Sequence, residues 1–171
     1  FSILKDNAQI LFSNPSKILN FGAGHGGISH LFWKNNFSVV NVEFSKMKIK
    51  YDERWKQYTD IDQIPFDNKF DLIYGSHSIE HLNNLELFNQ KIEALLNLNG
   101  FVFWEVPNGA NPVNGGCNGK ICAPHTYYFT RAYFDSIPNF KVIFNKLFDS
   151  NNLETDNEKK GSVIRYLGIK C

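Results

Sequence analysis

The sequence predicts an α/β fold in which helices cover both faces of a mostly parallel β-sheet. Apolar runs of strand length alternate with segments of helical apolar periodicity along most of the chain. A glycine cluster, residues 22–27, directly follows the first apolar run, as expected for a strand–turn–helix unit. The chain has 171 residues, of which 43% are hydrophobic. That length and composition are sufficient for one domain, 1–171, with a full core.

The first half of the chain opens with a predicted short helix over 3–11, whose apolar residues share one face before Pro15 ends it. Four runs of strand length follow, at residues 17–21, 38–44, 55–59 and 70–74, of which 55–59 is short and mostly polar. Residues 28–33, between the first two runs, have helical periodicity. The fourth run ends at Gly75. This order of elements is typical of parallel strands joined by helical crossovers.

The second half begins with a predicted helix over 85–98, because Asn99-Gly100 is a typical helix C-terminus. A shorter helix is expected over 130–137, capped by Thr130. The remaining strand-length runs are at 101–106, 140–148 and 162–169. Residues 149–160 between the last two runs are polar and charged, so we expect a solvated hairpin connection and antiparallel strands.

Residues 107–126 break this alternation and are rich in Asn, Gly and Pro, which predicts a long irregular loop. Loops of this length in compact domains are usually functional. Two of the three cysteines, Cys117 and Cys122, lie in it and could form a zinc site with His125. They lack the paired C-x-x-C spacing of structural zinc sites, so we interpret them as ordinary loop residues.

Charge and cysteine content limit the classes of partner. The 18 basic and 17 acidic residues give a net charge of +1, so we expect neither nucleic acid nor a membrane surface as a partner. The number of cysteines, three, is small and odd, which argues against a disulfide framework and favours a cytoplasmic protein. No apolar run reaches the length of a membrane span, and the N-terminus lacks a signal-peptide pattern. Because the chain starts at Phe1 rather than Met, we expect that residues are missing upstream.

The strongest local motif is the glycine turn that follows the strand over 17–21. Glycines allow left-handed backbone and close approach of a ligand, and the following helix N-terminus presents free N–H groups. Gly22, Gly24 and Gly27 fit the dinucleotide pattern G-x-G-x-x-G, whereas Gly22, Gly24 and Gly26 fit the G-x-G-x-G of S-adenosylmethionine (SAM) sites. Glu43, at the end of the next strand, could accept hydrogen bonds from ribose hydroxyls in either case.

Two further segments resemble class I SAM-dependent methyltransferases, in particular the small-molecule, ubiquinone-methyltransferase-like group. Residues 64–82, IPFDNKFDLIYGSHSIEHL, resemble the family's L-P-F, F-D and E-H motifs, and residues 124–130, PHTYYFT, resemble the stretch before its sixth strand. The order of elements agrees from residue 17 to residue 170. The resemblance implies a three-layer sandwich around a seven-stranded sheet, mostly parallel with the last strand antiparallel, and SAM as cofactor.

The resemblance also implies a cofactor site at the ends of the first, second and fourth strands. The residues expected to bind SAM are Asn20, Gly22, Ala23, Gly24, Gly26, Glu43, Phe44, Asp60, Ile61, Gly75, Ser76 and His77. Among them, Glu43 is expected on the ribose, Asp60 and Ile61 on the adenine, and residues 75–77 at the sulfonium end. Relatives usually carry Asp or Glu where this chain has Asn20, and an amide cannot offer a full charge to the SAM ammonium.

Methyl transfer needs alignment of the acceptor with the carbon–sulfur bond, exclusion of water and, for a hydroxyl acceptor, a general base. The predicted catalytic residues are His81, His125 and Glu80, at the mouth of the site. If a helix begins at His77, then His77, Glu80 and His81 share one face. Some relatives hold a divalent ion with Glu-x-x-Glu-His, and here His77 replaces the first Glu. His77, Glu80, His81 and His125 are therefore metal candidates, although we do not expect a metal to be required.

Residues 77–81, HSIEH, also match H-x-x-E-H, an inverted zinc-protease motif, but that motif needs a long helix rather than the end of a buried strand. We therefore predict methyl transfer from SAM to a small molecule, most readily a hydroxyl of a sugar, glycan precursor or quinone-like phenol. Two alternatives remain at this point. One is an NAD-dependent oxidoreductase, which the glycine turn allows, and the other is a catalytically inactive SAM-binding module, which Asn20 allows.

Overall fold

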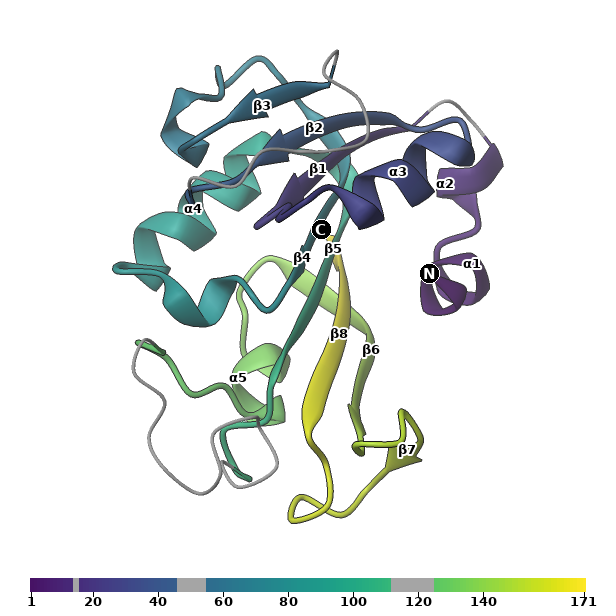
Figure 1. Ribbon diagram of the computed structural model, residues 1–171, viewed down its shortest axis with the longest axis vertical. Coiled ribbons are helices and arrows are strands. Elements are labelled where there is room, and N and C mark those ends of the chain that lie inside the picture. The colour runs from purple at the N-terminus through teal and green to yellow at the C-terminus, as the bar shows by residue number, and fades with distance from the viewer. Residues whose placement is uncertain (14–15, 46–54, 112–124) are drawn as a thin grey trace.

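The computed structural model describes residues 1–13, 16–45, 55–111 and 125–171. These residues form one eight-stranded sheet with the order β3-β2-β1-β4-β5-β8-β6-β7 (Figure 1). The strands are β1 (Lys17–Phe21), β2 (Ser38–Val42), β3 (Lys56–Tyr58), β4 (Phe70–Ser76), β5 (Leu96–Pro107), β6 (Phe140–Phe148), β7 (Glu154–Thr155) and β8 (Val163–Lys170). The α-helices are α1 (Ser2–Asn7), α2 (Ile10–Ser13), α3 (Gly27–Lys34), α4 (Leu85–Leu95) and α5 (Arg131–Asp135), and the 3-10 helices are η1 (Ile61–Gln63) and η2 (Ile79–His81).

The α/β architecture predicted from the sequence is confirmed, with eight strands instead of seven. Strands β3, β2, β1, β4 and β5 pair in parallel, whereas β8 is antiparallel to both β5 and β6. The additional strand, β7, lies within the expected polar connection. Its two residues, Glu154 and Thr155, pair antiparallel with Phe148 and Leu147 at the end of β6. Part of the connection between β6 and β8 therefore forms a short strand of its own.

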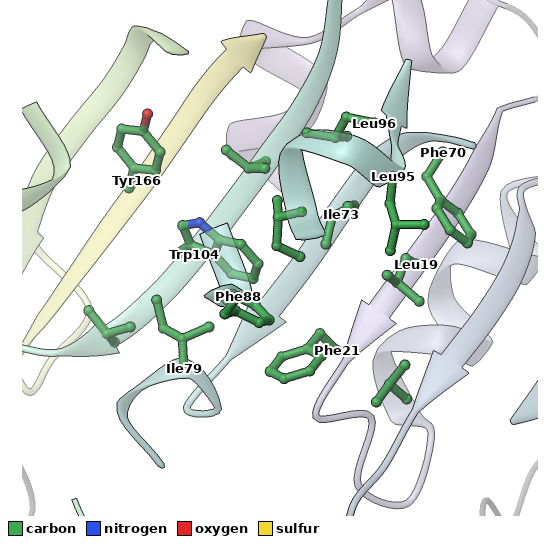
Figure 2. Close-up of a cluster of buried hydrophobic side chains, with 14 of the residues drawn as sticks. Leu19, Phe21, Phe70, Ile73, Ile79, Phe88, Leu95, Leu96, Trp104 and Tyr166 are labelled. Carbon is green, nitrogen blue, oxygen red and sulfur yellow. The ribbon is translucent and has the colours of Figure 1, made fainter. Parts of the chain in front are cut away.

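Helices cover both faces of the sheet and create two hydrophobic cores. On one face, Leu4, Leu11 and Phe32 of α1, α2 and α3 pack against alternate strand residues such as Ile18. On the other face, α4 and α5 cover a larger cluster, part of which Figure 2 shows around Phe88 and Trp104. Because successive strand residues point to opposite faces, each central strand contributes to both cores. The three-layer arrangement therefore follows from strands that are apolar on both sides.

Three helices differ from the prediction. The helix expected over 130–137 ends at Asp135, and the side chain of Thr130 makes no capping hydrogen bond. The opening segment forms two short helices rather than one, because the chain leaves the helix at Ala8 and thereby places Leu4, Ala8 and Leu11 on the sheet. The helix expected over 85–98 ends at Leu95, since Leu96 is already extended and pairs with Phe70. Pairing with β4 thus outweighs the local helix-end signal. Within residues 1–13, 16–45, 55–111 and 125–171, no helix has the length and apolar character needed to cross a membrane.

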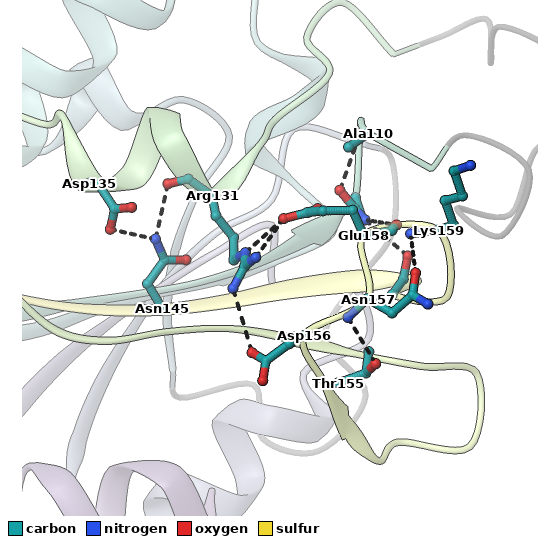
Figure 3. Close-up of polar contacts among 11 residues, drawn as sticks. Ala110, Arg131, Asp135, Asn145, Thr155, Asp156, Asn157, Glu158 and Lys159 are labelled. Atoms are coloured by element: carbon teal, nitrogen blue, oxygen red, sulfur yellow. Dashed lines mark hydrogen bonds and ion pairs between the residues drawn. The ribbon is translucent and has the colours of Figure 1, made fainter.

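The polar turn after β7 is tied to the start of the loop that follows β5. The amide of Asn108 donates to the carbonyls of Glu158 and Gly161, at 3.1 and 3.0 Å, and the amide of Asn111 donates to the carbonyl of Lys159 at 2.5 Å. Figure 3 shows Arg131 donating from Nε and Nη2 to one carboxylate oxygen of Glu158, at 2.9 and 2.7 Å. These side chains anchor the first described residues of the predicted 107–126 loop. Residues 112–124 of that loop lie outside the described part.

Candidate active site

The predicted site residues lie at one edge of the sheet, where parallel strands end. Phe21 at the end of β1 pairs with Val42 and Gly75, and Ser76 pairs with Glu105. The carboxyl ends of β1, β2, β4 and β5 therefore meet, which is where ligands bind in open α/β sheets. A cavity of about 870 Å³ lies at the opposite edge, where β1, β2 and β3 begin, and none of the predicted site residues lines it.

The glycine turn is formed and fixed by backbone hydrogen bonds. The N–H groups of Gly22 and Ala23 donate to the carbonyl of Val42 at 2.9 and 3.0 Å, which joins the turn to the end of β2. Gly22, Gly24 and Gly26 all have positive φ, at 72°, 54° and 86°. Glycine is the residue that adopts this conformation without strain, so the sequence pattern reflects a backbone requirement at all three positions. Gly26 then caps the N-terminus of α3.

The glycines at this edge differ in what surrounds them. A Cβ on Gly22 would lie 2.5 Å from Cβ of Ser78, and one on Gly75 would lie 2.7 Å from the ring of Trp104. Both positions are glycine because neighbouring side chains fill the space. A Cβ on Gly24 would meet no described atom within 4 Å. Gly24 is therefore a point of the turn at which a ligand can approach the backbone.

Glu43 is the carboxylate nearest to this open position. Its side chain accepts hydrogen bonds from the backbone N–H of Gly24, at 2.6 Å, and of Ser45, at 2.8 Å. Glu43 is 4% exposed, and its own N–H donates to Tyr58 of β3. Each carboxylate oxygen has two lone pairs, so both retain a site for a ribose hydroxyl. The predicted ribose contact remains a prediction with a suitable geometry.

Asn20 is committed to a buried network beneath the turn. Its amide donates to the hydroxyl of Ser29 on α3 at 2.7 Å, and that hydroxyl donates to the side-chain oxygen of Asn41 at 2.5 Å. All three residues are buried. An amide at position 20 therefore supplies a donor that an Asp could not, which gives a structural reason for the departure from the family pattern. A direct role of Asn20 toward SAM is untested.

Three further predicted cofactor residues lie on the two segments beyond β2 and β3: Phe44, and the two residues expected on the adenine, Asp60 and Ile61. Phe44 follows β2, is 54% exposed and packs against Phe21 with ring centroids 5.9 Å apart. Asp60 caps η1 by accepting from the N–H of Asp62 at 2.8 Å, and Ile61 packs against the larger core. An exposed aromatic ring beside a strand end can stack on a base. The cofactor contact of Phe44 and the adenine contacts of Asp60 and Ile61 also remain predictions.

Histidines surround a single buried carboxylate beyond β4. Glu80 is 1% exposed, and its Oε1 lies 3.7 Å from Nδ1 of His77 and 3.8 Å from Nε2 of His81. The expected helix from His77 is absent: His77 has a positive φ of 49°, and a single 3-10 turn, η2, carries Glu80 and His81. The 3-10 turn nevertheless brings both imidazoles to the carboxylate.

His125 reaches the same carboxylate from a distant segment. The N–H groups of Thr126 and Tyr127 donate to the backbone carbonyl of Glu80, at 2.8 and 3.1 Å. The rings of His81 and His125 consequently approach to 4.8 Å between centroids in an edge-on contact. The three residues predicted to be catalytic therefore do meet. Their catalytic roles are not tested by this geometry.

Electrostatics distinguish the histidines. The Glu80 carboxylate raises the pKa of His77 above its ordinary value, although burial opposes this effect. Burial lowers the pKa of His125, and the neighbouring His81 and His77 lower it further against the opposing effect of Glu80. His125 is thus the more readily neutral of the two imidazoles, as a general base must be before it accepts a proton.

Sequence reasoning missed an ion pair that supports the histidines. Arg165 on β8 donates from Nε to Glu105 on β5 at 2.6 Å, and Ser76 donates to the other oxygen of Glu105 at 2.8 Å. Burial alone would raise the pKa of Glu105, but these two hydrogen bonds and the charge of Arg165 hold it below its ordinary value. Glu105 also faces His77 Nε2 at 3.9 Å, and its carbonyl accepts from the His77 N–H. The available sequence signal was that two predicted apolar strands each contain one charged residue, Glu105 in one and Arg165 in the other, and that these charges are opposite.

Cys117 and Cys122 lie outside the described residues, and Cys171 is a free, exposed thiol at the end of the chain. The metal candidates from the sequence do converge in part, because ligand atoms of Glu80, His81 and His125 all lie within 4.8 Å of one another. His77 approaches the same carboxylate from β4.

Comparison with solved structures shows the same fold. A SAM-dependent methyltransferase from Mesorhizobium loti superposes with a TM-score of 0.73 at 13% identity, covering 99% of this chain and 96% of that one. One from Archaeoglobus fulgidus gives 0.72 at 17% identity, covering 99% and 92%. The 1,6-didemethyltoxoflavin-N1-methyltransferase of Burkholderia thailandensis, solved with its substrate and S-adenosylhomocysteine bound, gives 0.68 at 15% identity, covering 98% and 77%.

Comparison at the level of sequence identifies the family. A search of curated protein sequences returned no match. The sequence model of a family described as "Methyltransferase domain" matches residues 2–164, nearly the whole chain. The fold, the order of elements and this match confirm the resemblance seen in the motifs, whereas the ubiquinone-like subgroup stays a prediction. The chain belongs to the methyltransferase-domain family, and it is an enzyme of the class I, Rossmann-like SAM-dependent type.

Proposed function

We propose that this enzyme transfers a methyl group from SAM to a hydroxyl oxygen of a small molecule. The observation that carries the proposal is the open backbone at Gly24 beside the buried carboxylate of Glu43, in a chain of the methyltransferase-domain family. A nucleoside placed there would have its ribose at Glu43. Its sulfonium end would point toward the end of β4, where Ser76 and His77 begin the histidine segment.

SAM is the cofactor that fits this arrangement. The three left-handed glycines match the G-x-G-x-G pattern, and the Burkholderia enzyme with the same fold was solved with S-adenosylhomocysteine. Asn20 does not weigh against the assignment, because its amide serves a buried network. No finding favours an NAD-dependent oxidoreductase or an inactive module.

The proposed chemistry is a direct displacement. A lone pair of the acceptor oxygen attacks the methyl carbon as the carbon–sulfur bond breaks, and S-adenosylhomocysteine leaves as a neutral thioether. The hydroxyl proton passes to an imidazole, and His125 or His81 is the proposed base. The buried carboxylate of Glu80 stabilises the resulting positive charge. The protein's main contribution is the alignment of acceptor and cofactor.

The acceptor is proposed to be small. Near-neutral net charge gives no general attraction to nucleic acid, and sugars, glycan precursors and phenols all offer suitable hydroxyls. The Burkholderia enzyme methylates a ring nitrogen according to its name. A nitrogen acceptor is therefore an alternative to oxygen, and identifying the methylated atom of the product distinguishes the two.

The cofactor assignment is tested by titrating SAM, S-adenosylhomocysteine and NAD separately in thermal-shift and calorimetric measurements. We expect SAM and S-adenosylhomocysteine to bind and to raise the unfolding temperature, because a ligand of the native state stabilises it. Stabilisation by NAD alone would overturn the assignment. Incubation with methyl-labelled SAM and a metabolite extract should then label a small molecule, whose mass fragmentation identifies the methylated atom. Labelling of nitrogen would refute the choice of oxygen.

A further inference from the structure

The side chain of Glu80 is buried without a hydrogen-bonding partner. It is 1% exposed, and neither carboxylate oxygen has a hydrogen bond within the described ranges. Its two histidine neighbours remain 3.7 and 3.8 Å from Oε1, beyond hydrogen-bonding distance. An ionised carboxylate that is removed from water is costly unless a cation or several donors compensate it. The site therefore needs a positive partner at these oxygens.

Two imidazoles are placed to share such a partner with Glu80. Ligand atoms of Glu80, His81 and His125 all lie within 4.8 Å of one another. Ligands at about 2.0–2.2 Å from one ion are separated by about 3–3.6 Å, so small side-chain rotations close the set. The backbone already holds both segments together, because Thr126 and Tyr127 donate to the Glu80 carbonyl.

We propose that Glu80, His81 and His125 bind one divalent transition-metal ion, with Zn²⁺ preferred to Mg²⁺. Two imidazole nitrogens and one carboxylate form the donor set of open catalytic zinc sites, whereas Mg²⁺ prefers a shell of oxygens. Three protein ligands leave a coordination position for an oxygen of the acceptor. His77 is not one of the proposed ligands. It lies between Glu80 and Glu105 and orients the carboxylate of Glu80.

The role of the ion rests on the proposed function, although its binding does not. A hydroxyl that coordinates a divalent cation loses its proton more easily, so an acceptor oxygen bound there would become a better nucleophile at neutral pH. With the ion bound, His81 and His125 are ligands and the hydroxyl proton passes to solvent water. The two imidazoles are the proposed bases of the metal-free enzyme only. This geometry favours acceptors with a second oxygen next to the reacting one, such as vicinal diols and catechols. Those are members of the sugar and phenol classes proposed above.

The test is metal binding by the full chain after treatment with a chelator. Calorimetric titrations with Zn²⁺ and Mg²⁺ should show one Zn²⁺ site per chain, with affinity for Zn²⁺ at least about tenfold higher than for Mg²⁺. Co²⁺ should give a visible absorption spectrum typical of mixed nitrogen and oxygen ligands. In E80Q and H125A we expect Zn²⁺ affinity to fall by about 10–100-fold or more. The matched control is H30A, which removes a histidine of α3 outside the cluster.

Zn²⁺ affinity that is unchanged in both E80Q and H125A, or no Zn²⁺ binding to the unmodified chain, would overturn the proposal. E80Q keeps the size of the side chain, so a loss of binding in that variant does not reflect a cavity, and circular dichroism checks the fold of H125A. SAM calorimetry on the same samples separates the two hypotheses. Metal binding without SAM binding would refute the proposed function alone, and SAM binding without metal binding would refute the metal site alone.

Discussion

The glycine turn and the histidine cluster lie at the same edge of the sheet but are built in different ways. The turn is made of backbone: Gly22, Ala23 and Gly24 donate N–H groups to Val42 and Glu43. The cluster is made of side chains, in which imidazoles from two separate segments surround the carboxylate of Glu80. One region comes from contiguous residues and the other from residues brought together by the fold.

This difference implies that the glycine turn and the histidine cluster have different functions. A backbone cradle suits a cofactor shared by a whole family, since it tolerates many side chains and depends on a few glycines. A side-chain cluster can change its donor set by single substitutions, as where His77 replaces the Glu of some relatives. We therefore expect substitutions in the turn to affect cofactor binding and substitutions in the cluster to affect turnover.

Gly24→Val gives the largest expected effect and tests the cofactor side of the comparison. The new side chain enters the open space at Gly24, and a β-branched residue at φ 54° adds backbone strain of about 1–3 kcal/mol. SAM affinity should fall by about 100-fold or more. Calorimetry measures the affinity, and chemical denaturation measures the stability lost to strain.

The matched control for this variant is Gly27→Ala, on the first residue of α3. A Cβ there also meets no described atom within 4 Å, and the position lacks a positive φ. Gly27 belongs to the dinucleotide pattern but not to the G-x-G-x-G pattern. We expect the alanine variant to keep SAM affinity. SAM bound equally well by the Gly24 variant would place the cofactor elsewhere.

The turn could be predicted from sequence because its cause is local. The glycine spacing, the preceding strand and Glu43 are all visible within a short stretch, and strand β1 was predicted with its observed limits, Lys17–Phe21. The end of α4 could not be predicted, because Asn99-Gly100 resembles a helix end while pairing of Leu96 with Phe70 decides the conformation. Long-range pairing outweighed the local signal there.

The cluster could be predicted only in part. Glu80 and His81 were candidates from their motif, and His125 from a separate resemblance, but their contact depends on Thr126 and Tyr127 bonding to the Glu80 backbone. Glu105 and Arg165 were missed altogether, because only the antiparallel register of β5 and β8 places them opposite each other. Charge pairs between strands distant in sequence carry no spacing that a motif could encode.

His81→Ala gives the second largest expected effect and tests the cluster. Removing an imidazole that contacts Glu80 and His125 should lower turnover by about 100-fold, as is typical for loss of acid–base or metal-supported catalysis. SAM affinity should stay unchanged, because the glycine turn is untouched. Steady-state kinetics with the labelled acceptor, beside SAM calorimetry, measure both quantities. Unchanged turnover would remove His81 from the catalytic set, and a parallel loss of SAM affinity would break the division between the two regions.

Glu105→Gln gives the smallest expected effect and tests whether the ion pair between Glu105 and Arg165 stabilises the folded protein. Arg165 and Ser76 hold the pKa of Glu105 below its ordinary value of 4.5 in the folded protein. The ionised form is therefore favoured by folding, and its contribution is present above the unfolded-state pKa. It is lost as the pH falls through the lower folded-state pKa. At neutral pH we expect the variant to be less stable by about 1–2 kcal/mol.

Urea unfolding of both proteins between neutral and acidic pH measures this contribution. The difference in unfolding free energy should be largest near neutrality and should shrink below pH 4.5, because protonation removes the charge from Glu105 as the substitution does. SAM affinity should remain, since neither oxygen of Glu105 contacts the glycine turn, whereas turnover should fall modestly through looser placement of His77. A stability difference that grows toward acid would show that folding raises the pKa of Glu105, so that burial outweighs the hydrogen bonds from Arg165 and Ser76. The support that β5 gives to the cluster would then have to come from the backbone hydrogen bond between His77 and Glu105.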